Sequence, residues 1–85
     1  MKAAGGHVQG KYNIIDESCK MAHIVGNGTS EEKRSNAHTL DWNGNAWYAG
    51  SVESTKVILR SSTPNSTKKF ALSIDDNGIL SIEEV

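Results

Sequence analysis

The sequence predicts an all-β fold in which short repeated β-coils, of the β-roll or solenoid type, lead into a β-hairpin and a C-terminal three-stranded meander. Two observations support this prediction. A small residue followed by His and then by β-prone residues recurs along the first half of the chain, and turn residues separate short β-prone runs throughout. We place the repeat-bearing region at residues 1–50 and the meander at residues 51–85, together as one structural unit.

The repeat is centred on three histidines. His7, His23 and His38 each follow a small residue, and they are 16 and then 15 residues apart. This period fits one coil of a β-solenoid, in which each strand stacks above the last at a spacing of ~4.8 Å. We therefore expect the three histidines to be structural residues at equivalent positions of successive coils.

Two segments between the predicted coils have less regular patterns. Residues 29–36 (TSEEKRSN) resemble a capped helix start, but no apolar residue gives such a helix a face to bury, so we predict a solvated loop. Residues 13–20 (NIIDESCK) fit a short strand or a single helical turn, and we predict a strand that leads into a loop.

The second half of the chain has clearer β signals. The pair Asn43-Gly44 lies between two β-prone runs and predicts a hairpin, because both residue types tolerate positive φ. Residues 51–60 then predict a strand, and residues 70–75 alternate apolar and small or polar side chains. A turn at 76–78 leads into a last short strand, which completes the meander.

The composition predicts a thin core. Leu, Ile, Val and Phe make up only 17 of the 85 residues, whereas Ser, Thr, Asn and Gly make up 30. A chain of this length forms one domain at most, and a compact monomer of this size buries only ~60–65% of its unfolded surface. We therefore expect the chain to complete its core with other copies of itself.

Charge and hydropathy exclude several functions. Nine basic and ten acidic residues, without a basic stripe, argue against a nucleic-acid binder. No run approaches the ~18 apolar residues of a membrane span, and the N-terminus lacks the apolar region of a signal peptide. The single Cys19 excludes an internal disulfide framework and has no partner at metal-ligand spacing.

The segments AHIVGNGTS, RSNAHTLDWNGNAWYAGSVES and VILRSSTPNSTKKFALSIDDNGILSIEEV resemble the C-terminal segments of tail, baseplate and fibre proteins of phages and prophages of Gram-positive gut bacteria. The resemblance spans roughly residues 21–85, and NAHTLDWNGNAWYAG is its specific part. The repeated coils are more loosely similar to the left-handed β-roll heads of trimeric autotransporter adhesins. The longer period and the charged insertion at residues 31–34 depart from the adhesin pattern.

This resemblance implies an intertwined homotrimer that serves as a structural stalk or tip and contacts other tail or fibre proteins. It implies a location in the virion, in a phage tail encoded by a prophage, with the bacterial cell surface as the alternative. We expect no enzymatic activity and no cofactor. Host-surface glycan is a further partner to consider, whereas nucleic acid and membrane insertion are not expected.

Two groups of residues are candidate binding sites. In a trimer, His7, His23 and His38 would each form a ring of three imidazoles about the axis, which suits Zn or Ni, although we favour a structural role. Acid would then weaken the trimer by placing like charges close together. Trp42, Trp47 and Tyr48 flank a turn and are candidates for a sugar-stacking platform, although large aromatic residues more often fill the core of such a small hairpin.

Adjacent carboxylates do not predict a catalytic pair. Neighbouring residues on a strand point to opposite faces, so two adjacent carboxylates do not converge on one substrate atom. We interpret all four acidic pairs as turn and surface charges. They are Asp16-Glu17, Glu31-Glu32, Asp75-Asp76 and Glu83-Glu84.

Overall fold

The structure, a computed structural model, describes residues 5–85 and contains seven β-strands and no helix within that range. The all-β prediction is therefore confirmed. No helix of the described range is long and apolar enough to cross a membrane. The strands are β1 (His7–Lys11), β2 (Met21–Asn27), β3 (Asn36–Asp41), β4 (Ala46–Tyr48), β5 (Val57–Arg60), β6 (Lys69–Ile74) and β7 (Leu80–Glu84).

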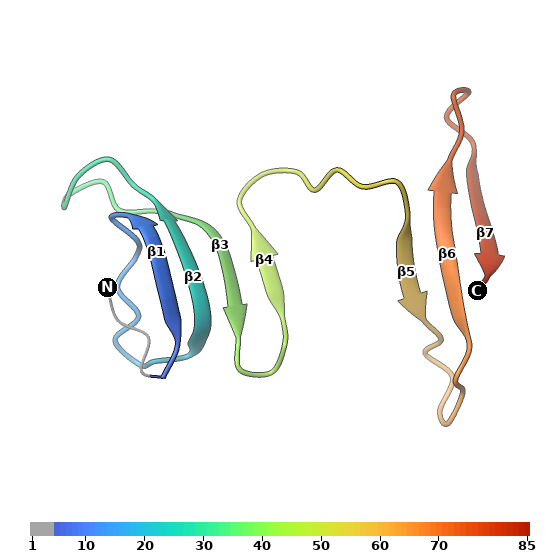
Figure 1. Cartoon of the computed structure of the whole chain (residues 1–85), viewed down its shortest axis with the longest axis horizontal. Helices are drawn as coiled ribbons and strands as arrows, with labels where there is room; N and C mark the ends of the chain where they lie inside the picture. Colours follow the sequence, from blue (N-terminus) through green and yellow to red (C-terminus); the bar gives the residue numbers. More distant parts are fainter. Residues whose placement is uncertain (1–4) are drawn as a thin grey trace. The chain divides into compact units, whose positions relative to one another are not determined.

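The chain divides into two compact units, Met1–Val52 and Glu53–Val85. The first unit holds a four-stranded sheet of order β1-β2-β3-β4, and the second holds a three-stranded sheet of order β5-β6-β7 (Figure 1). The second sheet is antiparallel throughout and is the predicted meander. Its first strand is shorter than predicted, because residues 51–56 form no strand.

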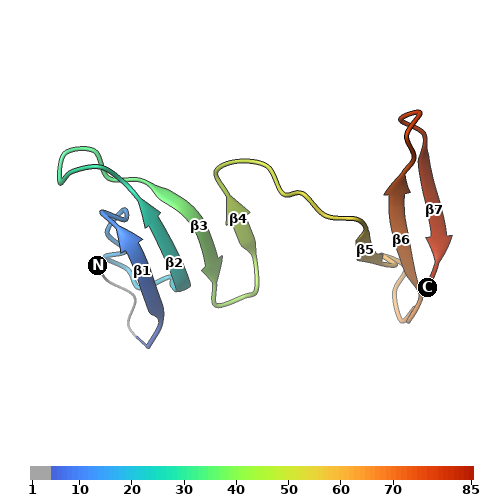
Figure 2. The same ribbon diagram turned by 45° about the horizontal axis from the view of Figure 1, so that its top comes forward.

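Strands β1 and β2 pair in parallel (Figure 2). Their register places His7 opposite His23. The segment that joins them, residues 12–20, crosses one face of the sheet at Gly26. A Cβ atom at Gly26 would lie 2.5 Å from the carbonyl oxygen of Lys11 and 2.7 Å from the amide nitrogen of Asn13. Glycine is therefore required at this position by the close approach of the two backbones.

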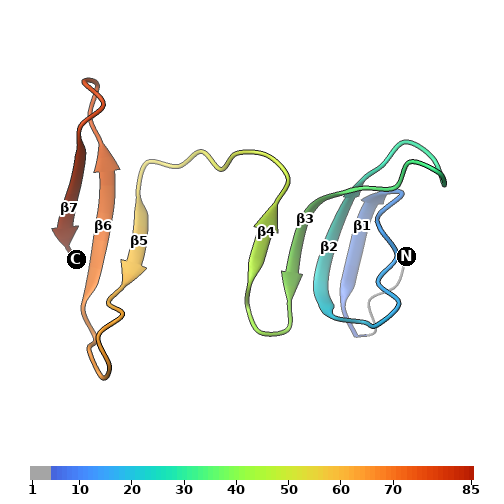
Figure 3. The same cartoon turned by 180° about the vertical axis from the view of Figure 1, so that it is seen from behind.

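Strand β3 pairs antiparallel with β2, as Figure 3 shows from behind. The third histidine thus does not continue the parallel stacking that successive coils require, and the prediction of three equivalent coils is wrong for His38. The physical reason lies in residues 28–35, where Thr29 N–H donates to Lys33 O and Asn27 N–H donates to Ser35 O. These bonds reverse the chain direction, and the segment is a loop, as predicted.

Residues 13–20 form no strand, which corrects the prediction of a short strand there. The backbone N–H of Ile14 donates to the Asn36 side chain, at 2.9 Å, rather than to a neighbouring strand. The small core of the unit is formed by three buried side chains. Asn13 comes from this segment, and Ile24 and Thr39 come from strands β2 and β3. Ile24 is 1% exposed and is the single large apolar side chain of residues 5–85 that is fully buried.

Two hairpins use the same loop, Asp-x-Asn-Gly-x. In the first, Asp41 N–H donates to Asn45 O and Gly44 N–H donates back to Asp41 O. In the second, Asp75 makes the equivalent bonds with Ile79 and Gly78. Only the glycines of these loops have positive φ, so each is a three-residue loop with a left-handed glycine. The hairpin prediction is correct, and of the pair Asn43-Gly44 it is Gly44 that has the positive φ.

Replacing Gly44 by Val is expected to destabilise the β3–β4 hairpin by about 1–2 kcal/mol. The cause is backbone conformation alone, because φ of Gly44 is +87° and no atom lies within 4 Å of the position of an added Cβ. Thermal unfolding followed by tryptophan fluorescence measures the effect, since Trp42 lies in this loop and Trp47 on the strand that follows it. Gly50→Val is the control, because Gly50 has neither a positive φ nor a close neighbour. Equal melting temperatures for the two variants would contradict the prediction.

Candidate functional site

A row of aromatic rings crosses the four-stranded sheet, with one ring from each strand. His7 stacks on His23 with ring centroids 5.3 Å apart and an interplanar angle of 14°. His23 lies 5.3 Å from His38 in a tilted arrangement. His38 stacks on Tyr48 at 4.3 Å. We call these four residues the aromatic row.

The strand registers explain why the row forms. Directly opposed residues on neighbouring strands place their side chains on the same face. His7 is opposite His23 in the parallel pair, and His38 is opposite Tyr48 in the antiparallel pair. His23 is opposite Leu40, so its ring reaches His38 as a diagonal neighbour. The row thus depends on the loop at Gly44, which fixes the register of β3 against β4.

Hydrogen bonds hold the two outer histidines. His38 Nδ1 donates to the carbonyl oxygen of Trp47 at 3.0 Å, which leaves Nε2 as the acceptor in the neutral ring. His7 Nε2 lies 3.0 Å from the side-chain oxygen of Gln9 and donates to it. Both imidazoles are therefore oriented by neighbours within the sheet. Fixed ring orientations of this kind are consistent with a structural role for the stacked side chains.

The row does not form a metal centre within one chain. The imidazole rings lie side by side along the sheet, so their nitrogens do not converge on one point. Within residues 5–85, no group of three or more His, Cys, Asp or Glu is placed to hold a metal ion. The ring of three copies of one histidine considered in the sequence analysis requires further chains.

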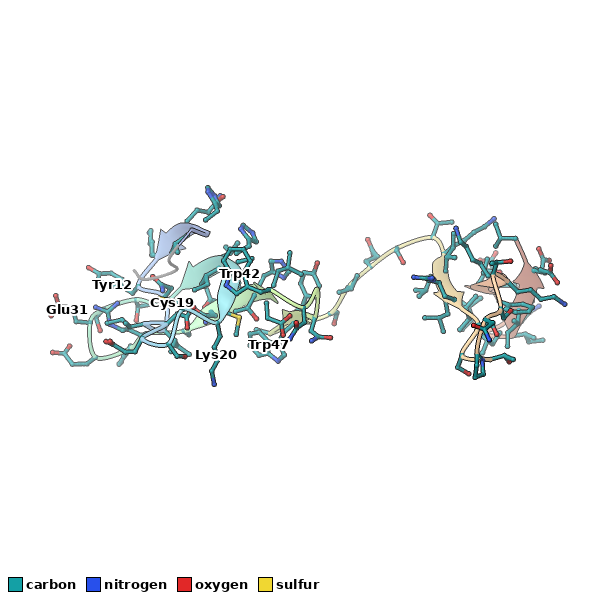
Figure 4. The ribbon with its side chains drawn as sticks, turned by 90° about the horizontal axis from the view of Figure 1, so that it is seen from below. Tyr12, Cys19, Lys20, Glu31, Trp42 and Trp47 are labelled. Atoms are coloured by element: carbon teal, nitrogen blue, oxygen red, sulfur yellow. The ribbon has the colours of Figure 1, made fainter. Side chains whose placement is uncertain are left out.

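The three candidate glycan-binding residues do not form one platform. Tyr48 belongs to the aromatic row, whereas Trp47 precedes it on the same strand and therefore points to the opposite face. Trp42 lies in the hairpin loop, and its indole Nε1–H donates to Cys19 O at 3.1 Å, as can be followed in Figure 4. Each side chain is about half exposed, at 55% for Trp42, 52% for Trp47 and 50% for Tyr48.

The stacking of Tyr48 on His38 was missed by sequence reasoning, although a local signal exists. A three-residue loop that pairs Asp41 with Asn45 fixes the register of the residues that follow. Each step outward moves one residue along both strands, so the third step places His38 opposite Tyr48. Identifying the loop type from the Asp-x-Asn-Gly sequence would therefore have identified this pair.

Asp41 organises the loop beside the row. Its carboxylate accepts hydrogen bonds from the backbone N–H groups of Asn43 and Asn45, each at 2.9 Å, and from the Asn45 side chain at 3.0 Å. The side-chain bond from Asn45, followed by the backbone bonds, lowers the pKa of Asp41 below its ordinary value of 3.8. The loop therefore favours the ionised carboxylate.

We expect the carboxyl group of Asp41 to titrate below pH 3.8 in an NMR pH titration. Because its pKa is lowered in the folded chain, its contribution to hairpin stability is complete above the unfolded pKa and is lost as the pH falls through the folded pKa. Asp41→Asn should remove this acid-dependent part of the stability. Asp76→Asn, which also removes one loop carboxylate, is the control and should leave it intact. A midpoint at or above 3.8 for Asp41 would contradict the assignment.

Two further carboxylates from the acidic pairs, those of Asp16 and Asp75, hold turns. The Asp16 carboxylate accepts the backbone N–H groups of Lys20 and Met21 and thereby holds the turn before β2. The Asp75 carboxylate accepts those of Asn77 and Ile79. The backbone carbonyl of Cys19 accepts the hydrogen bond from Trp42.

Comparison of the chain with protein-family models, with curated proteins and with solved structures finds no match.

Proposed function

We propose that the chain is a non-enzymatic structural segment of a phage or prophage tail fibre or baseplate, in which it helps to form or present a host-attachment structure as a homotrimer. The observation that carries this proposal is that far more large apolar side chains are exposed than are buried in the core. Among the described residues, the buried apolar side chains are Ile24 and Ala71, whereas 15 large apolar side chains are exposed. Such a chain is suited to burying surface against copies of itself.

The roles of the polar groups also support a structural function. Imidazoles stack across the sheet, and the carboxylates of Asp16, Asp41 and Asp75 hold turns. These groups stabilise local backbone geometry.

The solution mass tests the assembly. Light scattering of the full chain should give about 28 kDa, three times the 9.2 kDa of one chain. The physical reason is that the exposed apolar residues need partners to bury them. A monodisperse species of 9.2 kDa that unfolds cooperatively would overturn the homotrimer.

A second experiment tests the location. Phage particles released from a bacterium that carries the encoding prophage should contain the chain. Antibody labelling in electron microscopy should place the chain at the tail of these particles. A stable trimer that is absent from the particles would contradict the tail assignment while leaving the assembly intact.

The alternative function is a carbohydrate-binding or adhesin-like tip module. The observation that favours it is the half exposure of Trp42, Trp47 and Tyr48. Acrylamide quenching of the assembled protein separates the two functions, because both tryptophans remain quenchable if they face ligand and become protected if they pack in an interface. A glycan that shifts the tryptophan emission would favour the tip module.

A further inference from the structure

One face of the C-terminal sheet is apolar across all three strands. The register aligns Val57 with Leu72 and Ile82, and the same face continues through alternate residues of each strand. We call this surface the apolar face. Its members are Val57, Leu59, Phe70, Leu72, Ile74, Leu80 and Ile82.

The opposite face of the same sheet has a different character. It carries charged and small polar side chains around one aliphatic residue and one alanine, so the sheet is two-sided. Its members are Ile58, Arg60, Lys69, Ala71, Ser73, Ser81 and Glu83. A sheet with this pattern buries its apolar side against another layer and leaves its polar side in water.

Most of the apolar face is exposed within the second unit, Glu53–Val85, and only Phe70 and Leu72 on the middle strand are partly buried. Leu80 and Ile82 are 57% and 63% exposed, and Val57, Leu59 and Ile74 are also exposed. The one buried apolar residue of this unit, Ala71, lies on the other face. Three strands need a covered hydrophobic face for independent stability, so this sheet requires another layer.

The exposed surface of the whole chain is also larger than that of compact units. The chain exposes 6806 Å², whereas two separately compact units of these lengths expose about 5,900 Å² together. The apolar face is one part of this excess of about 900 Å². A standard interface buries about 800 Å² on each partner, so an excess of this size favours association.

The chemistry of the face indicates its occupant. Glu84 is the charged residue at its rim, and it pairs with Lys68 at 3.9 Å, so the face presents no charge for a charged partner to match. A single peptide strand added at an edge would leave most of a three-stranded face uncovered. The same sheets of other copies of the chain, packed about 10 Å away, would cover it.

We infer that the apolar face of β5-β6-β7 is the surface through which copies of this chain associate, each sheet packing its apolar side against those of two other copies. The inference rests on the homotrimer of the proposed function and assigns its interface. The polar face then lies outward. Leu72, on the middle strand β6, has the central position, with Val57 of β5 on one side and Ile82 of β7 on the other.

Charge placed on the apolar face beside Leu72 tests the inference. Ile82→Lys should lower the mass found by light scattering three-fold, from the trimer to the single chain, because the charge would be buried without a partner. Ser81→Lys is the matched control, since it adds the same charge to the neighbouring residue on the opposite face. An Ile82→Lys variant that remains as trimeric as Ser81→Lys would overturn the assignment.

Disulfide trapping gives an answer even if the lysine variant fails to fold. Ile82→Cys should form covalently linked copies under mild oxidation, whereas Ser81→Cys should not exceed the background that Cys19 gives in the wild-type chain. Equal crosslinking of the two variants would also overturn the inference.

The outcomes separate the interface from the proposed function. A trimer that resists Ile82→Lys disproves this interface but not the homotrimer. Conversely, crosslinked copies of a protein that is absent from phage particles would support the interface and disprove the tail assignment.

Discussion

Gly26→Ala is expected to abolish the native fold of the N-terminal sheet. The added Cβ would lie 2.5 Å from Lys11 O, 2.7 Å from Asn13 N and 2.8 Å from Asn13 Cα, and all three are backbone atoms. No side chain can rotate away to make room, so the segment joining β1 to β2 has to lift from the sheet. The cost is at the upper end of the ~1–3 kcal/mol typical of overpacking, or beyond it. Displacement of Asn13 would also open the core around Ile24.

Tryptophan fluorescence measures this effect selectively, because both tryptophans of the chain lie in the N-terminal unit. We expect emission of the variant without denaturant to match that of the unfolded wild type. Gly50→Ala is the control, since no atom lies within 4 Å of its added Cβ and its φ is not positive. A Gly26→Ala variant with the unfolding midpoint of Gly50→Ala would show that the crossing seen at Gly26 is not native.

Local turn chemistry made much of the fold predictable. The sequences around Asn43-Gly44 and Asp76-Asn77-Gly78 specify their loops through bonds between residues a few positions apart. Such interactions are encoded in short segments and do not require knowledge of the rest of the chain. The three-stranded meander and the β3–β4 hairpin followed from them.

Long-range pairing was less predictable. The spacing of 15 residues between His23 and His38 fits both a further coil and a hairpin with a long loop. The backbone hydrogen bonds that close the loop of residues 28–35 form the hairpin. Ile14 and Ile15 have the residue type of a strand but are exposed, and the N–H of Ile14 is taken by the Asn36 side chain, 22 positions away. A side chain so distant in sequence leaves no local signal.

The candidate site likewise has one part that the sequence predicted and one part that it did not. The sequence predicted His7 and His23 at equivalent positions of neighbouring strands, and the parallel register places them side by side. The grouping of Trp42, Trp47 and Tyr48 was inferred from nearness in sequence alone. Adjacent strand residues point to opposite faces, so Tyr48 joins the histidines while Trp47 does not.

Ile24→Ala is expected to destabilise the N-terminal sheet by about 2–5 kcal/mol. The side chain is 1% exposed and lies opposite Val8 on one neighbouring strand and Thr39 on the other. Its removal leaves a cavity beneath the segment that carries Asn13, and the close backbone contact at Gly26 limits how far that segment can settle into the space. With so small a core, this loss is a large fraction of the stability of the unit.

Ile14→Ala provides the matched comparison, because the chemical change is the same while Ile14, in the same unit as Ile24, is 54% exposed. Urea unfolding of both variants, followed by tryptophan fluorescence at one chain concentration, keeps the contribution of assembly constant. We expect the midpoint of Ile24→Ala to fall well below that of the wild type and that of Ile14→Ala to stay close to it. Similar midpoints for the two variants would mean that Ile24 is not the centre of the core, and that the stability of this sheet comes from contacts between chains instead.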